Sequence, residues 1–132
     1  MSEYTVNSHV SDKEWQVVNK ARNHEFICDT VDQNAGPNPA EYLCGSVNSC
    51  LSISAAMIAK VHQLDVKNFK VENKATTKKL EHGKSIVSKM EINLLFDTSM
   101  NDKEKQAFVD HVLRVSTIYQ TLKSVIDIDV KF

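Results

Sequence analysis

Two stretches of the sequence carry hydrophobic residues at the three- and four-residue spacing of a helix that buries one face. The first runs from Pro39 to about His62, and the second follows Asn101 and runs to about Leu122. The recurring positions of the first are Leu43, Val47, Cys50, Leu51, Ser54, Ile58 and Val61, and those of the second are Phe108, Val112, Val115, Tyr119 and Leu122. The pattern therefore predicts two helices, over 39–62 and 101–122.

The first helix has a clear start signal. Asn38 is a favourable N-cap, Pro39 suits the first helical position, and Glu41 can reach back to the Asn38 amide. Small residues occupy the remaining faces, so the helix is nearly apolar all round and is expected to lie buried in the centre of the molecule. A chain of this size covers such a helix with difficulty, and we expect self-association to cover it.

Alternation of apolar and polar residues predicts strands elsewhere. Near the N-terminus it is weak, at about 4–6, 15–17 and 26–28, whereas 69–75, 85–96 and 125–132 alternate clearly, with a hairpin loop over 79–85. The order of elements predicts an α+β fold with antiparallel sheet. The 132 residues show no linker or repeat, so a single domain over 1–132 is expected.

Charge and hydropathy exclude several partners. The net charge is −1, and lysines and acids are spread along the chain, so no basic footprint for nucleic acid or an anionic membrane is present. The longest apolar stretches are expected to fall far short of the roughly 18 residues of a membrane span, and the N-terminus lacks a signal-peptide pattern. We expect a cytoplasmic protein without membrane or nucleic-acid partners.

The three cysteines, Cys28, Cys44 and Cys50, include no CxxC pair and no Cys/His cluster. This pattern argues against a disulfide scaffold and a structural zinc site, and no metal or cofactor is expected. Cys44 and Cys50 are six residues apart, which on a helix is a rise of about 9 Å, so they cannot form a disulfide with each other. Cys44 is expected to be a core residue; Cys50 is either core or a reactive thiol.

The stretch "GPNPAEYLCGSVNSCLSISAAMIAK" resembles the central-helix signature of the OsmC/Ohr family. In that signature a Gly-x-Asn/Thr-Pro start is followed by a glutamate, a run of small and apolar residues, and a cysteine eleven residues after the proline, as Cys50 is after Pro39. The resemblance implies an OsmC/Ohr-like fold, with antiparallel sheets around a long buried central helix. It also implies an intertwined homodimer with active sites at the subunit interface.

The resemblance implies that the Cys50 thiolate attacks an organic hydroperoxide and becomes a sulfenic acid, which a second cysteine then captures. Aligned by distance from the closing strand, Ser116 stands where the family has that second cysteine. Cys28 is the only other candidate. We therefore predict a hydroperoxide reductase that works with Cys50 alone and an external thiol reductant.

An alternative is a non-catalytic dimer that binds a small hydrophobic molecule at the subunit interface, and a third is an interaction scaffold. Leu51, Ile53, Met57 and Tyr119 are expected to form apolar surroundings for Cys50 and to favour bulky hydrophobic peroxides.

In the family an arginine from the N-terminal region activates the thiolate and pairs with a glutamate near the helix start. Arg22, expected on the strand "KARNHEF", is the first candidate and Arg114 the second. Glu41 is the corresponding acid, although a capping box would also explain it. His111 is expected to face solvent. The predicted catalytic residues are Cys50, Glu41 and Arg22.

Overall fold

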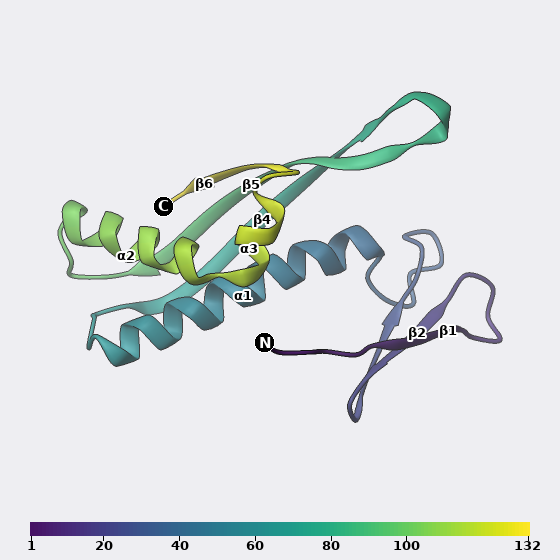
Figure 1. Ribbon diagram of the computed structural model, residues 1–132, viewed down its shortest axis with the longest axis horizontal. Helices are drawn as coiled ribbons and strands as arrows, with labels where there is room; N and C mark the ends of the chain where they lie inside the picture. Colours follow the sequence, from purple (N-terminus) through teal and green to yellow (C-terminus); the bar gives the residue numbers. More distant parts are fainter. The chain divides into compact units, whose positions relative to one another are not determined.

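A three-stranded antiparallel sheet, ordered β1-β2-β3, forms the N-terminal part of the computed structural model, which describes residues 1–132 (Figure 1). Its strands are β1 (Asn7–Val10), β2 (Val17–Ala21) and β3 (His24–Cys28). This sheet belongs to a compact unit, Met1–Leu43, and Cys44–Phe132 forms a second unit. The single domain expected over 1–132 stays a prediction.

The strands of this sheet are shifted from the predicted positions. Tyr4 and Val6 precede β1, and Trp15 lies in the β1–β2 loop with a positive φ of 66° and an exposed fraction of 64%. Every residue of β1 is exposed, so the strand is formed by backbone pairing with β2 and has no buried face. An alternation of buried and exposed positions therefore could not have located it.

The loop after β3 is docked on that strand. The Asp29 backbone N–H donates to the Pro37 carbonyl at 3.1 Å. A Cβ on Gly36 would lie 2.5 Å from the Ile27 carbonyl oxygen, so only glycine permits this approach. The Tyr42 hydroxyl donates to the same Ile27 carbonyl. These contacts hold the start of the next helix against β3.

That helix, α1 (Pro39–Val61), begins as predicted. Asn38 Oδ1 accepts from the Glu41 backbone N–H at 2.8 Å, and Glu41 Oε1 accepts from the Asn38 N–H at 2.9 Å. This reciprocal pair is a capping box. The predicted helix start is therefore confirmed.

The second unit contains a sheet ordered β4-β5-β6, formed by β4 (Lys67–Lys79), β5 (Ser85–Asp97) and β6 (Asp127–Lys131). β4 and β5 form the predicted antiparallel hairpin, whose connection includes a 3-10 turn, η1 (Glu81–Gly83). β6 runs parallel to β5, so the prediction of a purely antiparallel sheet is wrong here. The intervening helices return the chain to the same end of β5, which an alternation pattern cannot indicate.

The predicted helix over 101–122 is two helices, α2 (Asp102–Val115) and α3 (Thr117–Leu122). The predicted Asn101–Glu104 capping box starts α2. Ser116 has an extended backbone (φ −80°, ψ 103°), and its hydroxyl donates to the Val112 carbonyl at 2.7 Å. The hydroxyl satisfies a carbonyl at the helix end, which helps the chain to break there.

Helices α1 and α2 cover one face of the second sheet (Figure 1). Four hydrophobic residues of α1 are buried together with residues of β5, α2 and the segment before β6. The buried hydrophobic residues are Val47, Leu51, Ala55, Ile58, Met90, Ile92, Leu94, Phe108, Val109, Val112 and Ile126. The core of the second unit is thus a sheet face closed by two helices.

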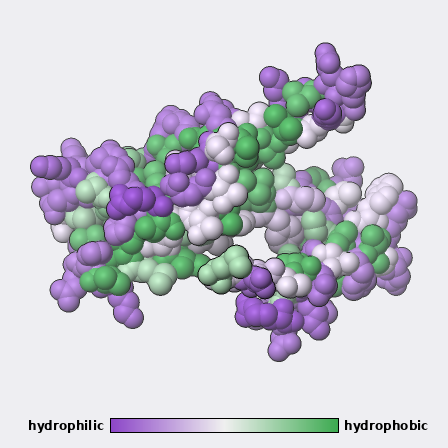
Figure 2. All heavy atoms as spheres, viewed as in Figure 1, coloured by the Kyte–Doolittle hydropathy of each residue, from purple (hydrophilic) through white to green (hydrophobic).

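The opposite face of α1 is exposed within the chain. Ile53, Met57 and Val61 have exposed fractions of 61%, 64% and 74%. Figure 2 shows hydrophobic residues at the surface along this helix. The expected burial of this helix on all sides is therefore not found within one chain, because the sheet covers only one side of α1.

The expectation that no segment is long and apolar enough for a membrane span does not hold for α1. It has 23 residues, and an 18-residue window within it has a mean hydropathy of 1.4. Of the residues in that window, 22% are buried. Core helices of soluble proteins meet the same test of length and composition, so the feature is weak evidence for a membrane segment.

Candidate functional site

Cys50 lies in the middle of α1 on the boundary between its buried and exposed faces. It is half-buried, between the buried Val47 and Leu51 and the exposed Ile53. It forms no disulfide. The thiol is therefore held on a regular helix and is partly accessible to solvent.

A part-buried hydroxyl pair lies one helical turn from Cys50. Ser54 follows Cys50 by four residues on α1, which places both on one face of the helix. Ser116 Oγ is 3.2 Å from Ser54 Oγ, and Ser116 is completely buried. The structure thus brings the position aligned with the second family cysteine next to the helical turn that carries Cys50.

The other cysteines occupy different surroundings. Cys28 is half-buried on β3, in the other compact unit, and forms no disulfide. Cys44 is half-buried near the start of α1, so the expected core position holds only in part. Neither is in a disulfide with Cys50.

Glu41 is exposed in the first turn of α1, and its Oε1 is engaged in the capping box with Asn38. No ion pair joins it to Arg22; the one salt bridge in the structure joins Lys67 and Asp65. Glu41 therefore has the structural role of closing the capping box, which was the alternative to a catalytic role. Its active-site role stays a prediction.

Arg22 was expected on a strand, and this prediction is wrong. It lies in the two-residue turn between β2 and β3, where Ala21 pairs with His24. Its φ is +55°, and it is exposed, with no hydrogen bond or ion pair. Turns of this kind place their first residue at positive φ, which the strand pattern did not reveal. Arg114 is exposed in the last turn of α2.

The predicted apolar surroundings of Cys50 fall on two sides of α1. Leu51 is fully buried toward the sheet, whereas Ile53 and Met57 are exposed. Tyr119 is half-buried on α3. Of these four predicted neighbours of Cys50, only Ile53 and Met57 therefore lie on the exposed face of α1.

An amide pair fixes how α1 sits on the sheet. Asn73 Nδ2 on β4 donates to Asn48 Oδ1 on α1 at 3.1 Å, and Asn73 Oδ1 is buried without a partner. Asn48 precedes Cys50 by two residues and so points to another side of the helix. The sequence patterns did not reveal this pair, because no local signal links residues of a helix and a distant strand.

His111 is half-buried rather than solvent-facing, and its ring centre lies 5.7 Å from that of His62. The two histidines line a cavity of about 290 Å³ between the end of α1 and α2. No group of three or more His, Cys, Asp or Glu side chains is arranged to hold a metal ion.

The carboxyl groups of Asp29 and Asp65 have shifted pKa values. Each accepts hydrogen bonds from backbone N–H groups of a loop. Desolvation raises the pKa of Asp29, but it is outweighed by hydrogen bonds from the Thr30 and Ala35 N–H groups and Gln33 and by the charge of Lys13. The pKa of Asp29 therefore lies below its ordinary value. Hydrogen bonds from the Ser99 hydroxyl and backbone N–H likewise lower the pKa of Asp65.

Comparison with known proteins points to one family. A family model described as OsmC-like protein matches residues 32–131, which include Glu41, Cys50 and Ser116 but not Arg22. A comparison with curated protein sequences found no match.

Solved structures share the fold over nearly the whole chain. An OsmC-like protein from Mycoplasma pneumoniae superposes with a TM-score of 0.87 at 12% identity, covering 98% of this chain and 94% of the other. An organic hydroperoxide resistance protein OsmC from Legionella pneumophila gives 0.75 at 12% identity, covering 99% and 96%. The organic hydroperoxide resistance protein OhrB of Bacillus subtilis gives 0.71 at 12% identity, covering 98% and 97%.

Proposed function

This chain belongs to the OsmC-like protein family, and from that premise we propose that it reduces organic hydroperoxides through Cys50 with an external thiol as reductant. The observation that carries the proposal is the partly accessible Cys50 on α1, within the family match and eleven residues after Pro39. Two structural neighbours described as organic hydroperoxide resistance proteins support this reaction class.

The proposed reaction begins at the sulfur atom. The Cys50 thiolate attacks one peroxide oxygen, an S–O bond forms, and the O–O bond breaks. The other oxygen leaves as an alkoxide and takes a proton to give an alcohol. Sulfur is oxidised by two electrons to a sulfenic acid, and the peroxide is reduced by two.

The second half of the cycle requires thiols from outside the chain. Ser116 presents a hydroxyl near the Cys50 turn, and a hydroxyl cannot form a disulfide. An external thiol therefore attacks the sulfenic sulfur, releases water and leaves a mixed disulfide. A second external thiol attacks that disulfide, regenerates Cys50 and leaves with the first thiol as an oxidised pair.

Cys50 lies about three turns into α1, beyond the reach of the positive N-terminal end of the helix dipole. Its thiolate therefore needs a nearby cation. We propose Arg22 for this role, with Arg114 as the second candidate. Because the Arg22 guanidinium sits at a hairpin tip without a partner, it is available to an anionic group.

We further propose that the protein is a homodimer. The exposed apolar face of α1, defined by Ile53, Met57 and Val61, supports this, because a helix face of this kind is costly to leave in water. Closure of that face by a second copy would provide the apolar surroundings expected for a hydrophobic peroxide.

A second candidate function is supported by the absence of a thiol at position 116. A dimer that binds a small hydrophobic molecule and leaves Cys50 inert would have no need for a resolving cysteine. The two functions differ in whether Cys50 is oxidised by peroxide.

The test is intact mass spectrometry of the reduced protein after one equivalent of cumene hydroperoxide, with and without a sulfenic-acid trap. The expected result is one trapped adduct per chain, located on Cys50, and none in Cys50→Ser. Cys44→Ser is the matched control, because it keeps Cys50 and changes the other thiol of the same helix.

An unmodified Cys50 thiol in folded protein would contradict the peroxidase proposal and favour the binding function. An adduct on Cys28 or Cys44 in place of Cys50 would show that the reactive thiol is a different one.

A further inference from the structure

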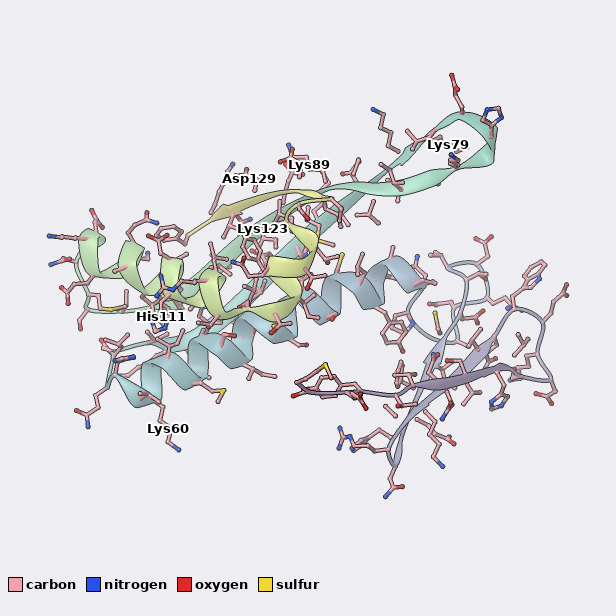
Figure 3. All side chains as sticks on the ribbon, in the orientation of Figure 1. Lys60, Lys79, Lys89, His111, Lys123 and Asp129 are labelled. Atoms are coloured by element: carbon pink, nitrogen blue, oxygen red, sulfur yellow. The ribbon has the colours of Figure 1, made fainter.

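The cavity between the C-terminal end of α1 and α2 lies apart from Cys50 and Ser116. Its floor includes Ile58 and Phe108, which are 7% and 3% exposed. His62, which follows α1 directly, and His111 of α2 lie together in its lining. Figure 3 shows His111 pointing from α2 toward α1.

The two imidazole rings are paired with each other and with nothing else. Their centres are 5.7 Å apart, and their planes are tilted by 59°, so they are not stacked. None of the four ring nitrogens takes part in a hydrogen bond or an ion pair. The ring nitrogens of both histidines are therefore uncommitted and lie at one place.

From this arrangement we propose that His62 and His111 bind one divalent transition-metal ion of the class that prefers imidazole, such as nickel or zinc. With a metal–nitrogen bond of about 2.0–2.1 Å and a near-tetrahedral angle, the centres of two ligating rings are about 5 Å apart. The observed 5.7 Å needs only a small side-chain adjustment to reach this spacing.

Negative groups near the pair come from the end of α1 and from Glu104, and one cation, Arg114, follows His111 by three residues on α2. His62 immediately follows α1, where its N–H donates to the Ile58 carbonyl, and the end of a helix carries a partial negative charge. Lys60, the nearest cation on α1, points away from α2 in Figure 3. Glu104 adds a carboxylate to the cavity lining. Imidazole is a borderline ligand, which selects transition metals over calcium or magnesium.

The site has only two protein ligands. Glu104 precedes His111 by seven residues on α2, a rise of about 10 Å, and its carboxylate serves the Asn101 capping box. This distance explains why no three-residue metal cluster is present. Water fills the other positions, so the affinity is lower than that of a structural zinc site, and the ion links α1 to α2.

The test is calorimetric titration of Ni²⁺ into untagged protein, with His62→Ala, His111→Ala and the matched control His82→Ala in the exposed β4–β5 turn. We expect one ion per chain in the parent and in His82→Ala. Each of the other two variants should bind at least about tenfold more weakly, since each loses one of two ligands. Ni²⁺ should also raise the Tm of the parent but not of His62→Ala.

His62 is exposed, so its variant is expected to fold even if His111→Ala does not. Undiminished binding by folded His62→Ala would overturn the proposal and assign the ion to other groups such as the cysteines. The absence of binding by the parent at millimolar Ni²⁺ would overturn it as well. Neither result bears on the reaction of Cys50.

Discussion

Position 116 carries a serine where the resemblance to the OsmC/Ohr family implies a second cysteine. Ser116 is completely buried, and its Oγ lies 3.2 Å from Ser54, one turn beyond Cys50. The resemblance at sequence level suggested this alignment, which stays a prediction; the structure shows that the α2–α3 junction contacts α1 through Ser116 and Ser54. Position 116 therefore lies against α1 one turn beyond Cys50 and carries a hydroxyl rather than a thiol.

Replacing this oxygen with sulfur provides a prediction. Ser116→Cys should form a disulfide between Cys50 and the introduced thiol after one equivalent of peroxide, which nonreducing peptide mapping would detect. Thr117→Cys, exposed one residue later, is the control and should form much less of that disulfide. Equal yields from both variants would contradict the proposed proximity.

Asp29 determines a pH dependence of stability. Its pKa in the folded state lies below the unfolded value of 3.8, so the stabilisation is complete above pH 3.8 and is lost as the pH falls through the folded-state pKa. Asp29→Asn should therefore lower the free energy of unfolding at pH 7 and have a smaller effect at pH 3. Urea denaturation at the two pH values measures this. An effect of the same size at both would contradict the assignment.

At the scale of elements, α1 has two faces with different roles. Val47, Leu51, Ala55 and Ile58 pack on the sheet and α2, while Ile53, Met57 and Val61 are exposed. The helical spacing correctly included Val47, Leu51 and Ile58, but it also included Val61, which is exposed, and it left out Ala55, which is buried. The β4-β5-β6 sheet covers α1 from one side only, so only one stripe of the helix is buried.

Leu51 tests the buried face. It is fully buried, so Leu51→Ala should lower the free energy of unfolding by about 2–5 kcal/mol, through lost burial and the cavity left behind. Lys60→Ala, at an exposed position of the same helix, should change it by less than about 0.5 kcal/mol. Chemical denaturation at a fixed protein concentration compares the two. Similar losses would place Leu51 outside the core.

At the scale of the whole molecule, the apolar face of α1 predicts self-association. Ile53→Asp and Met57→Asp would each put an unpaired carboxylate into the proposed interface. An uncompensated buried charge costs about 3–5 kcal/mol, so the dimer Kd should rise by about a hundredfold or more. Sedimentation velocity across a concentration series measures the change.

Lys103→Asp, an exposed charge change on α2, is the control and should leave the association unaltered. A parent protein that sediments as a monomer at all concentrations would contradict the proposed homodimer and leave the exposed face of α1 to another partner.

The sequence by itself determined the features that depend on neighbours along the chain. Both capping boxes are set by residues three positions apart, and α1, the start of α2 and the β4–β5 hairpin follow from short patterns along the chain. The family motif, too, is contained in one continuous stretch, so the order of residues along the chain is enough to identify it. Its interpretation as an OsmC-like chain is confirmed.

Only the tertiary structure decided which distant residues meet. Ser54 and Ser116 are 62 positions apart, β6 joins β5 in parallel across two helices, and His62 meets His111 from another element. These contacts depend on how the sheet face is covered, a choice made by packing that no local pattern encodes. The turn position of Arg22 and the exposed strand β1 were missed for a related reason, because backbone pairing, rather than side-chain burial, forms them.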